Sequence, residues 1–160
     1  MTMLKSFLAA SLVLSFLFVT SCTTRKTDIP SIISNIQTAM SNQDLSAFKK
    51  DIYADAADKK LMDAGTFSMS NLVYIAGQKY NYVFSTSSAT IPETGSDIEV
   101  TVPTTVTPGT TSGNSKFQMI NISTLPFTET WKVKKITLIG VTTPVVSLPK
   151  FIEIKAVEAK

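Results

Sequence analysis

The residue types that carry most enzyme chemistry are scarce in this chain of 160 residues. It has no histidine and one cysteine, Cys22, which excludes Ser-His-Asp and Cys-His catalysis, histidine-containing zinc sites and a disulfide framework. Three carboxylates, Asp51, Asp55 and Asp58, have a spacing that would place them on one helix face. Sites that bind a divalent cation through oxygen ligands need turn residues between those ligands. In this segment, lysines stand between the carboxylates instead. We therefore expect an ion-paired, solvated surface at these carboxylates, with no metal and no cofactor.

The basic residues do not indicate nucleic-acid binding. Lys132, Lys134 and Lys135 form a cluster, and the isoelectric point is about 9.0. The formal net charge is only +3, however, and Arg25 is the only arginine. A nucleic-acid-binding surface needs a denser basic patch. We expect these lysines to lie on the wet side of a strand, and we expect no enzymatic activity.

The cysteine stands at the end of an export segment. Lys5 precedes an apolar run over residues 7–19, and the small residues Thr20 and Ser21 come directly before Cys22. This layout is typical of a secretory signal. The run is too short for a membrane span, which takes about 20 apolar residues. The phrase Val19-Thr20-Ser21-Cys22 resembles the lipobox of bacterial lipoproteins.

The lipobox resemblance implies a processing event and an anchor. It implies cleavage between Ser21 and Cys22, a diacylglycerol thioether on the Cys22 sulfur, and acylation, for example with palmitate, of the new amino group. Two or three acyl chains hold a protein stably on a bilayer. In lipoproteins of enteric-type bacteria, an Asp directly after the cysteine favours retention in the inner membrane. This chain has Thr23 at that position, so it resembles the lipoproteins that are sorted to the outer membrane. We therefore expect residues 1–21 to be a cleaved signal peptide and the mature protein to lie in the bacterial cell envelope, with the outer membrane favoured.

The first half of the mature chain has helical periodicity. Residues 22–30 are polar and are predicted to form a tether, so the domain is expected over residues 31–160. A stripe of apolar residues predicts a helix over 31–40, and a second stripe at Leu45, Phe48 and Ile52 predicts another. A third short helix is expected from about residue 58 to 64, ending at Gly65.

Beyond Gly65 the hydrophobic period is two, which predicts strands. Segments 67–75 and 79–86 flank Gly77-Gln78 and predict a hairpin. Further strands are expected at 97–102, 117–124, 127–139 and 150–157. Residues 103–115 are rich in Thr, Pro and Gly and are predicted to form an exposed loop.

One predicted strand changes its buried face part of the way along. Trp131 and Val133 are apolar at odd positions, whereas Ile136 and Leu138 are apolar at even ones. Successive side chains of a strand point to opposite faces. We therefore predict a β-bulge at Lys134-Lys135.

Helices followed by strands predict an α+β fold, with two or three N-terminal helices packed on a curved antiparallel sheet of about five to six strands. The phrases Ser41-Asn42-Gln43-Asp44-Leu45, Tyr53-Ala54-Asp55 and Trp131-Lys132-Val133 resemble those of nuclear transport factor 2-like (cystatin-like cone) domains. This resemblance implies a curved sheet around a small cavity, used for ligand binding, catalysis or protein contact. Catalytic members use acidic or histidine groups in the cavity, and none can be placed here.

Two functional hypotheses follow. The first is a non-enzymatic envelope lipoprotein that contacts a protein or envelope component through its sheet or through residues 103–115. The alternative is a cavity-bearing carrier of a small or lipidic ligand. Four aromatic residues are the candidate ligand or partner surface: Tyr80, Tyr82, Phe84 and Trp131. The same alternation is also expected of an ordinary core that packs between a sheet and helices.

Overall fold

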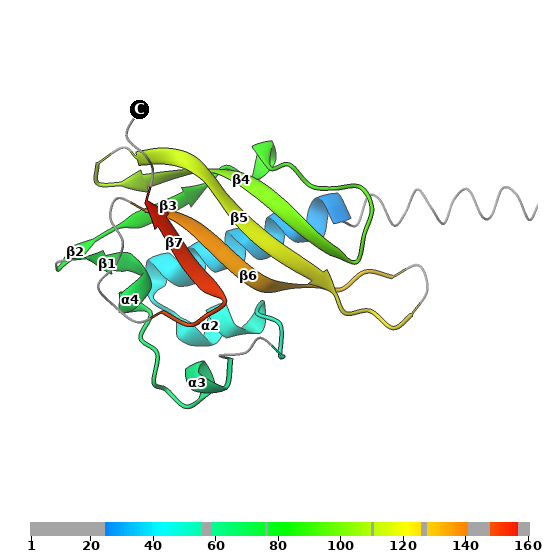
Figure 1. Cartoon of the computed structure of the whole chain (residues 1–160), viewed down its shortest axis with the longest axis horizontal. Coiled ribbons are helices and arrows are strands. Elements are labelled where there is room, and N and C mark those ends of the chain that lie inside the picture. The colour runs from blue at the N-terminus through cyan, green and yellow to red at the C-terminus, as the bar shows by residue number, and fades with distance from the viewer. Residues whose placement is uncertain are drawn as a thin grey trace, which may run out of the picture.

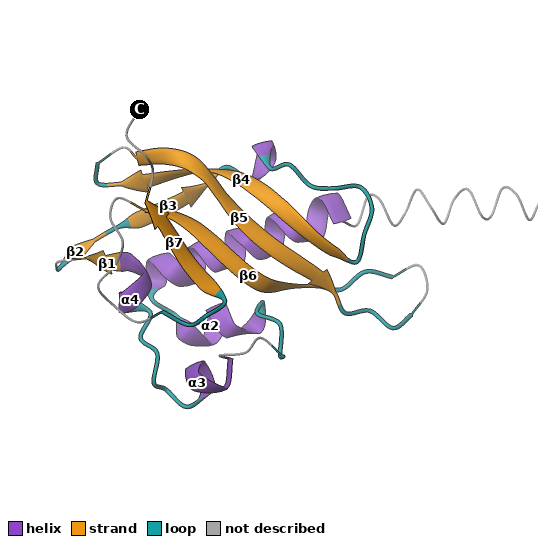
Figure 2. Ribbon diagram, in the orientation of Figure 1, coloured by secondary structure: helices purple, strands orange, loops and turns teal. Residues whose placement is uncertain are grey.

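One long helix lies across one face of a five-stranded sheet, which makes the fold α+β (Figures 1 and 2). This computed structural model describes residues 25–55, 59–75, 77–109, 111–125, 128–140 and 148–156. The strand order is β3-β4-β5-β6-β7, and β1 and β2 form a separate two-stranded sheet. The predicted fold class is confirmed.

The long helix α1 spans residues 25–42 and buries one apolar stripe. Ile33, Ile36 and Met40 are at most 2% exposed, as the sequence pattern predicts, and Ile29 extends the same stripe one turn earlier. The predicted tether over 22–30 is therefore wrong for residues 25–30. Pro30 lies inside this helix, although proline cannot donate a hydrogen bond to the carbonyl four residues earlier. Burial of Ile29 outweighs that lost hydrogen bond.

Three short helices follow α1. Helix α2 (Leu45–Lys50) is capped by Asp44, whose side chain accepts a 2.9 Å hydrogen bond from the Ala47 backbone N–H. Helix α3 (Lys59–Asp63) lies where a third helix was predicted, and Gly65 follows it with a φ of 73°. Helix α4 (Ser70–Val73) occupies part of the predicted strand over 67–75. That prediction is wrong because Leu72 and Val73 are both buried, which a half-exposed strand would not allow.

The predicted hairpin at Gly77 forms with shorter strands. Strand β1 (Tyr74–Ile75) pairs with β2 (Gln78–Lys79) in antiparallel register. Gly77 has a φ of 79°, a conformation that favours glycine. The chain then enters the large sheet as edge strand β3 (Asn81–Phe84).

Most of residues 103–115 lie in the two paired strands of a long hairpin, so the predicted loop is wrong. Strand β4 (Asp97–Thr107) pairs with β5 (Thr111–Asn121) over almost its whole length. Thr and Val favour pleated structure, and Val106 and Thr104 are buried on the inner face. Proline is disfavoured in interior strands because it cannot donate a hydrogen bond to the neighbouring strand. Pro103 contributes its carbonyl instead, which accepts a 2.8 Å hydrogen bond from the N–H of Ser85, the residue directly after β3.

The predicted bulge is confirmed in β6 (Trp131–Gly140). Gln118 pairs with Lys135 and Met119 with Val133, so Lys134 is the extra residue on β6. The bulge lets both halves of the strand bury their apolar side chains.

The far edge of β6 is covered in two pieces, one on each side of the bulge. Val133 exchanges 2.8 Å hydrogen bonds with Asp51 and Tyr53, which follow α2. Beyond the bulge, β7 (Ile152–Ala156) pairs with β6 in parallel. The expectation of a wholly antiparallel sheet is therefore wrong at this edge.

Among the described residues, no helix is long and apolar enough to span a membrane.

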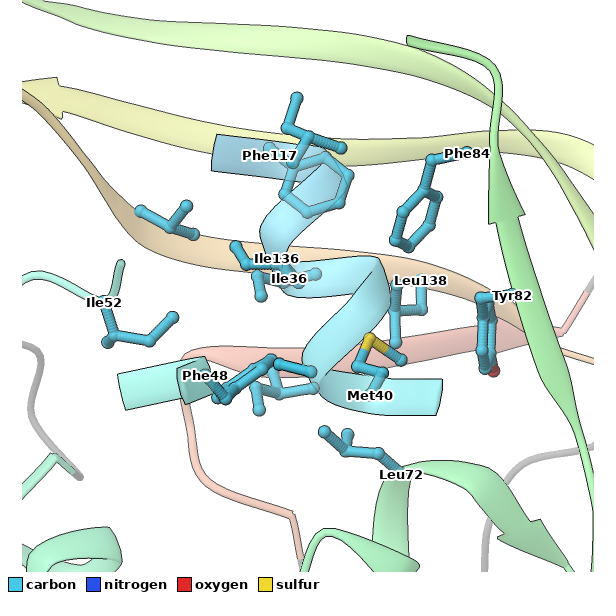
Figure 3. Close-up of a cluster of buried hydrophobic side chains, with 14 of the residues drawn as sticks. Ile36, Met40, Phe48, Ile52, Leu72, Tyr82, Phe84, Phe117, Ile136 and Leu138 are labelled. Atoms are coloured by element: carbon cyan, nitrogen blue, oxygen red, sulfur yellow. The ribbon is translucent and has the colours of Figure 1, made fainter. Parts of the chain in front are cut away.

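The core lies between α1 and the inner face of the sheet (Figure 3). Phe117 and Phe84 meet edge to face with their ring centroids 5.2 Å apart. Phe48 on α2 and Leu72 on α4 close the lower side of the cluster. The aromatic side chains of Tyr82, Phe84 and Phe117 lie on the inner face of the sheet and are at most 6% exposed.

Candidate functional site

The predicted aromatic surface is part of the core. Tyr82, Phe84 and Trp131 are 3%, 6% and 2% exposed, and Tyr80 is half-buried. Burial raises the pKa of the Tyr82 hydroxyl to about 12, because the phenolate would lie in apolar surroundings. Tyr82, Phe84 and Trp131 are therefore too buried to present a surface to a partner, and Tyr80 packs against the same core. Cys22 and Ser21, the predicted lipid attachment and cleavage residues, lie outside the described residues.

The structure describes two of the three carboxylates that could have shared a helix face, Asp51 and Asp55. Asp58 lies outside the described residues, and Asp51 and Asp55 follow α2 in turns. The Tyr53 hydroxyl donates a 3.0 Å hydrogen bond to Asp55, while burial raises the pKa of the Asp51 carboxyl. In the part of the chain that the structure describes, no group of three or more acidic, histidine or cysteine side chains could hold a metal.

The outer face of the sheet carries an assembly of charged side chains. Alternation along β4 to β7 points charged and amide groups away from α1, and no described element covers this face (Figure 2). A groove of about 340 Å³ runs across it. Its polar lining comes from all four strands: Glu99, Asn114, Lys116, Gln118, Lys135, Thr137, Glu153 and Lys155.

Ion pairs cross the strands on this outer face. Lys116 Nζ lies 2.6 Å from Glu99 Oε1, which joins β5 to β4. Lys135 Nζ lies 3.3 Å from Glu153 Oε2, which joins β6 to β7. The side chains of these pairs remain 42–55% exposed. They can therefore exchange their partners for groups on another molecule.

A third outer-face ion pair depends on the bulge. Lys134 Nζ lies 2.7 Å from Asp97 Oδ2, and Gln118 donates a 3.0 Å hydrogen bond to the other carboxylate oxygen. Both contacts lower the pKa of the Asp97 carboxyl, the Lys134 hydrogen bond most. Because the bulge places Lys134 and Lys135 next to each other, β6 presents two cations to the outer face at one point.

A buried ion pair stands at the end of the sheet where β4 begins. Arg25 donates hydrogen bonds of 3.2 and 2.5 Å to the two carboxylate oxygens of Glu129. The guanidinium also donates to the carbonyls of Pro92 and Gly95, and its carbon lies 4.9 Å from the centroid of Trp131. Trp131 Nε1 donates a 3.0 Å hydrogen bond to Glu129. The two charged side chains are 9% and 7% exposed.

Sequence reasoning missed both assemblies. Arg25 was assigned to the tether, and Glu129 lies 104 residues away from it. The one available clue was that Arg25 is the only arginine. The sequence analysis did place the lysines of β6 on the solvent-facing side of a strand. The pairing of Lys135 with Glu153 requires the parallel docking of β7, which no local pattern indicates.

Comparison of the chain with protein-family models, with curated proteins and with solved structures finds no match. Both resemblances therefore stay predictions. The geometry itself defines an α+β domain with one helix-covered sheet face and one uncovered, charged sheet face.

Proposed function

We propose that this chain is a lipid-anchored protein of the bacterial cell envelope that binds a protein or an envelope component and is not an enzyme. The binding surface is the outer face of β4 to β7. The lipobox-like phrase ending at Cys22 supports the anchor. The outer-membrane location remains the favoured one within this proposal.

The observation that carries the binding role is the grooved outer face. A solvated face is ordinary for an antiparallel sheet. This one also has a groove of about 340 Å³ lined by charges of both signs that are contributed by every strand from β4 to β7. Interleaved charges of both signs suit a polar partner with complementary charges, because such a partner can replace each internal pair. Lipidic ligands do not fit this lining.

The carrier hypothesis loses the observation that motivated it. Its aromatic row packs in the core, and Phe117 fills the space next to Phe84. Residues 103–115 also lose their assigned role, because replacing them with a short turn would delete paired strand rather than a loop. The uncovered face is the remaining candidate.

The anchor is tested first, in cells. The full chain should incorporate a labelled palmitate analogue and sediment with membranes. Cys22→Ser should abolish both, and Ser21→Ala, which keeps a small residue before the cysteine, should retain both. An unlabelled wild-type chain, or a labelled Cys22→Ser variant, would refute the lipoprotein assignment.

The binding face is tested by photocrosslinking in intact cells. A photoreactive residue at Gln118 on the outer face should give a discrete crosslinked product. The same residue at Thr38, exposed on α1, is the matched control and should give none. Lys135→Glu should abolish the Gln118 product while leaving the melting temperature nearly unchanged. A product that forms equally well from Thr38, or that survives Lys135→Glu, would exclude the outer face.

A further inference from the structure

Hydrogen bonds from Arg25 join the first residue of α1 to distant parts of the fold. Arg25 holds Glu129 with two hydrogen bonds and the carbonyls of Pro92 and Gly95 with one each. Only three residue steps separate Arg25 from Cys22, a reach of at most about 11 Å when fully extended. If Cys22 carries the lipid, the end of the domain that holds Arg25 must therefore lie against the head groups.

The β5–β6 loop, described at residues 122–125 and 128–130, lies at this same end (Figure 1). Glu129, the partner of Arg25, belongs to it. Leu125 is 67% exposed and Ile122 is 40% exposed. They are two of the three large apolar side chains that stand exposed in the described part of the chain; the third, Val83, is on β3.

Hydrogen bonds within the loop hold the two apolar side chains in place. The Asn121 side chain accepts 3.0 Å hydrogen bonds from the N–H groups of Ser123 and Thr130. The Thr128 hydroxyl donates a 3.1 Å hydrogen bond to the Leu125 carbonyl and also contacts the Ser123 hydroxyl. These hydrogen bonds tie the Leu125 backbone to Ser123 and Thr128, while the Leu125 side chain is 67% exposed.

Basic side chains flank the loop. Ile122 lines a groove of about 500 Å³ together with Lys49, Lys50, Lys59 and Lys132. Asp63 pairs with Lys49 and Lys59, and the Asp51 carboxylate lies near Lys50 and Lys132. Apolar side chains next to lysines are the combination that binds an anionic bilayer surface.

We propose that the β5–β6 loop is a second membrane contact, in which Leu125 and Ile122 enter the boundary between head groups and acyl chains next to the lipid anchor. This rests on the proposed acylation of Cys22. The Arg25–Glu129 pair then sets the orientation of the domain, because it joins the anchored end of α1 to the inserted loop. In this orientation β4 runs away from the membrane, so the outer face of the sheet is roughly perpendicular to the bilayer surface.

The test uses the acylated full chain in vesicles of phosphatidylethanolamine and phosphatidylglycerol that contain nitroxide-labelled lipid. Because an acylated Cys22 has no free thiol, a fluorophore can be placed on one introduced cysteine, in Leu125→Cys or in Val83→Cys. Val83 is a matched control, since it is also an exposed apolar residue. It pairs with Thr105, eight residues along β4 from Asp97, or roughly 26 Å further from the membrane.

We expect the nitroxide lipid to quench the fluorophore at residue 125 at least about threefold more than at residue 83. Equal quenching at the two positions, with the Cys22 thiol blocked, would overturn the loop contact and leave the anchor intact. A wild-type chain whose denatured form reacts with maleimide at Cys22 would instead overturn the anchor, and the loop contact with it.

Discussion

Two kinds of ion pair in this molecule differ mainly in burial. Arg25 and Glu129 are 9% and 7% exposed and are surrounded by Trp131 and backbone carbonyls. Lys116 and Glu99, on the outer sheet face, are 50% and 55% exposed at a similar distance. Water screens the second pair and not the first.

The comparison teaches that similar charges take different roles in the two places. Removing one partner of a buried pair strands a charge in a low-dielectric site, so the buried pair is a structural requirement. An exposed pair gains little from its own contact and can be given up to a binding partner. The stability of this fold should therefore depend on Arg25, and its recognition on the outer-face lysines.

The largest effect is expected from Glu129→Gln. This variant keeps the volume and the acceptor for Trp131 Nε1, but it leaves the Arg25 guanidinium buried without a counter-charge. We expect a loss of about 3–5 kcal/mol in the free energy of unfolding, which corresponds to a fall in Tm of roughly 10 °C. Urea unfolding measures the loss, with Glu99→Gln as the exposed control. Equal losses in the two variants would show that burial does not separate the two pairs.

The second effect is a coupling between the two buried partners. Arg25→Met combined with Glu129→Gln removes both charges, so no stranded charge remains. We expect the double variant to lose less than the sum of the single variants, with an interaction energy of about 1–3 kcal/mol. A double-mutant cycle measured by urea unfolding gives this value. Strict additivity would mean that the Arg25 contacts to Pro92 and Gly95 carry the stabilisation instead.

A smaller, pH-dependent effect is expected at Asp97. Its folded-state pKa is lowered by the Lys134 and Gln118 hydrogen bonds, so the folded state holds this proton less tightly than the unfolded chain does. The resulting stabilisation is present above the unfolded pKa of about 3.9 and is lost as the pH falls through the lower folded value. Since both partners are exposed, it should stay below about 1 kcal/mol. Unfolding of the wild type and of Asp97→Asn, each compared at neutral pH and at about pH 3, measures it, and an identical pH dependence would contradict it.

The smallest effect is expected from exchanging an exposed pair. Glu99→Lys combined with Lys116→Glu keeps the contact and reverses its direction. We expect a change in Tm of less than about 2 °C, because exposed pairs contribute less than about 1 kcal/mol. The crosslinked product from Gln118 should nevertheless be lost, because the charges that face the partner are reversed. A retained product would show that the partner does not read these charges.

Local pattern predicted the elements whose burial follows a single period. The stripe of Ile33, Ile36 and Met40 identified α1, and the change of parity between Val133 and Ile136 identified the bulge at Lys134. The predicted loop was wrong because the Pro and Gly content of the segment favoured a loop, whereas its alternating side chains suit a strand. Residues 103–115 look like a loop because of their glycines and prolines, yet their Thr and Val residues complete two paired strands.

The candidate site was less predictable than the fold. Alternation could place Glu99 and Lys116 on a wet face, but it could not choose whether Tyr82 and Trp131 face a ligand or a core. The Arg25–Glu129 pair joins residues 104 positions apart, and no periodicity relates them. Contacts of this kind are set by how α1 lies on the sheet.

The sequence by itself determined the α+β order of the elements, the helical stripe and the bulge, and it carries the export and lipobox-like segment that ends at Cys22. These features depend on side-chain period and on short contiguous phrases, which are local. Tertiary structure alone decided that β7 joins β6 in parallel, that the aromatic row is buried, and that Arg25 meets Glu129. Those outcomes depend on which distant surfaces exclude water from one another, and that is settled only when the whole domain packs.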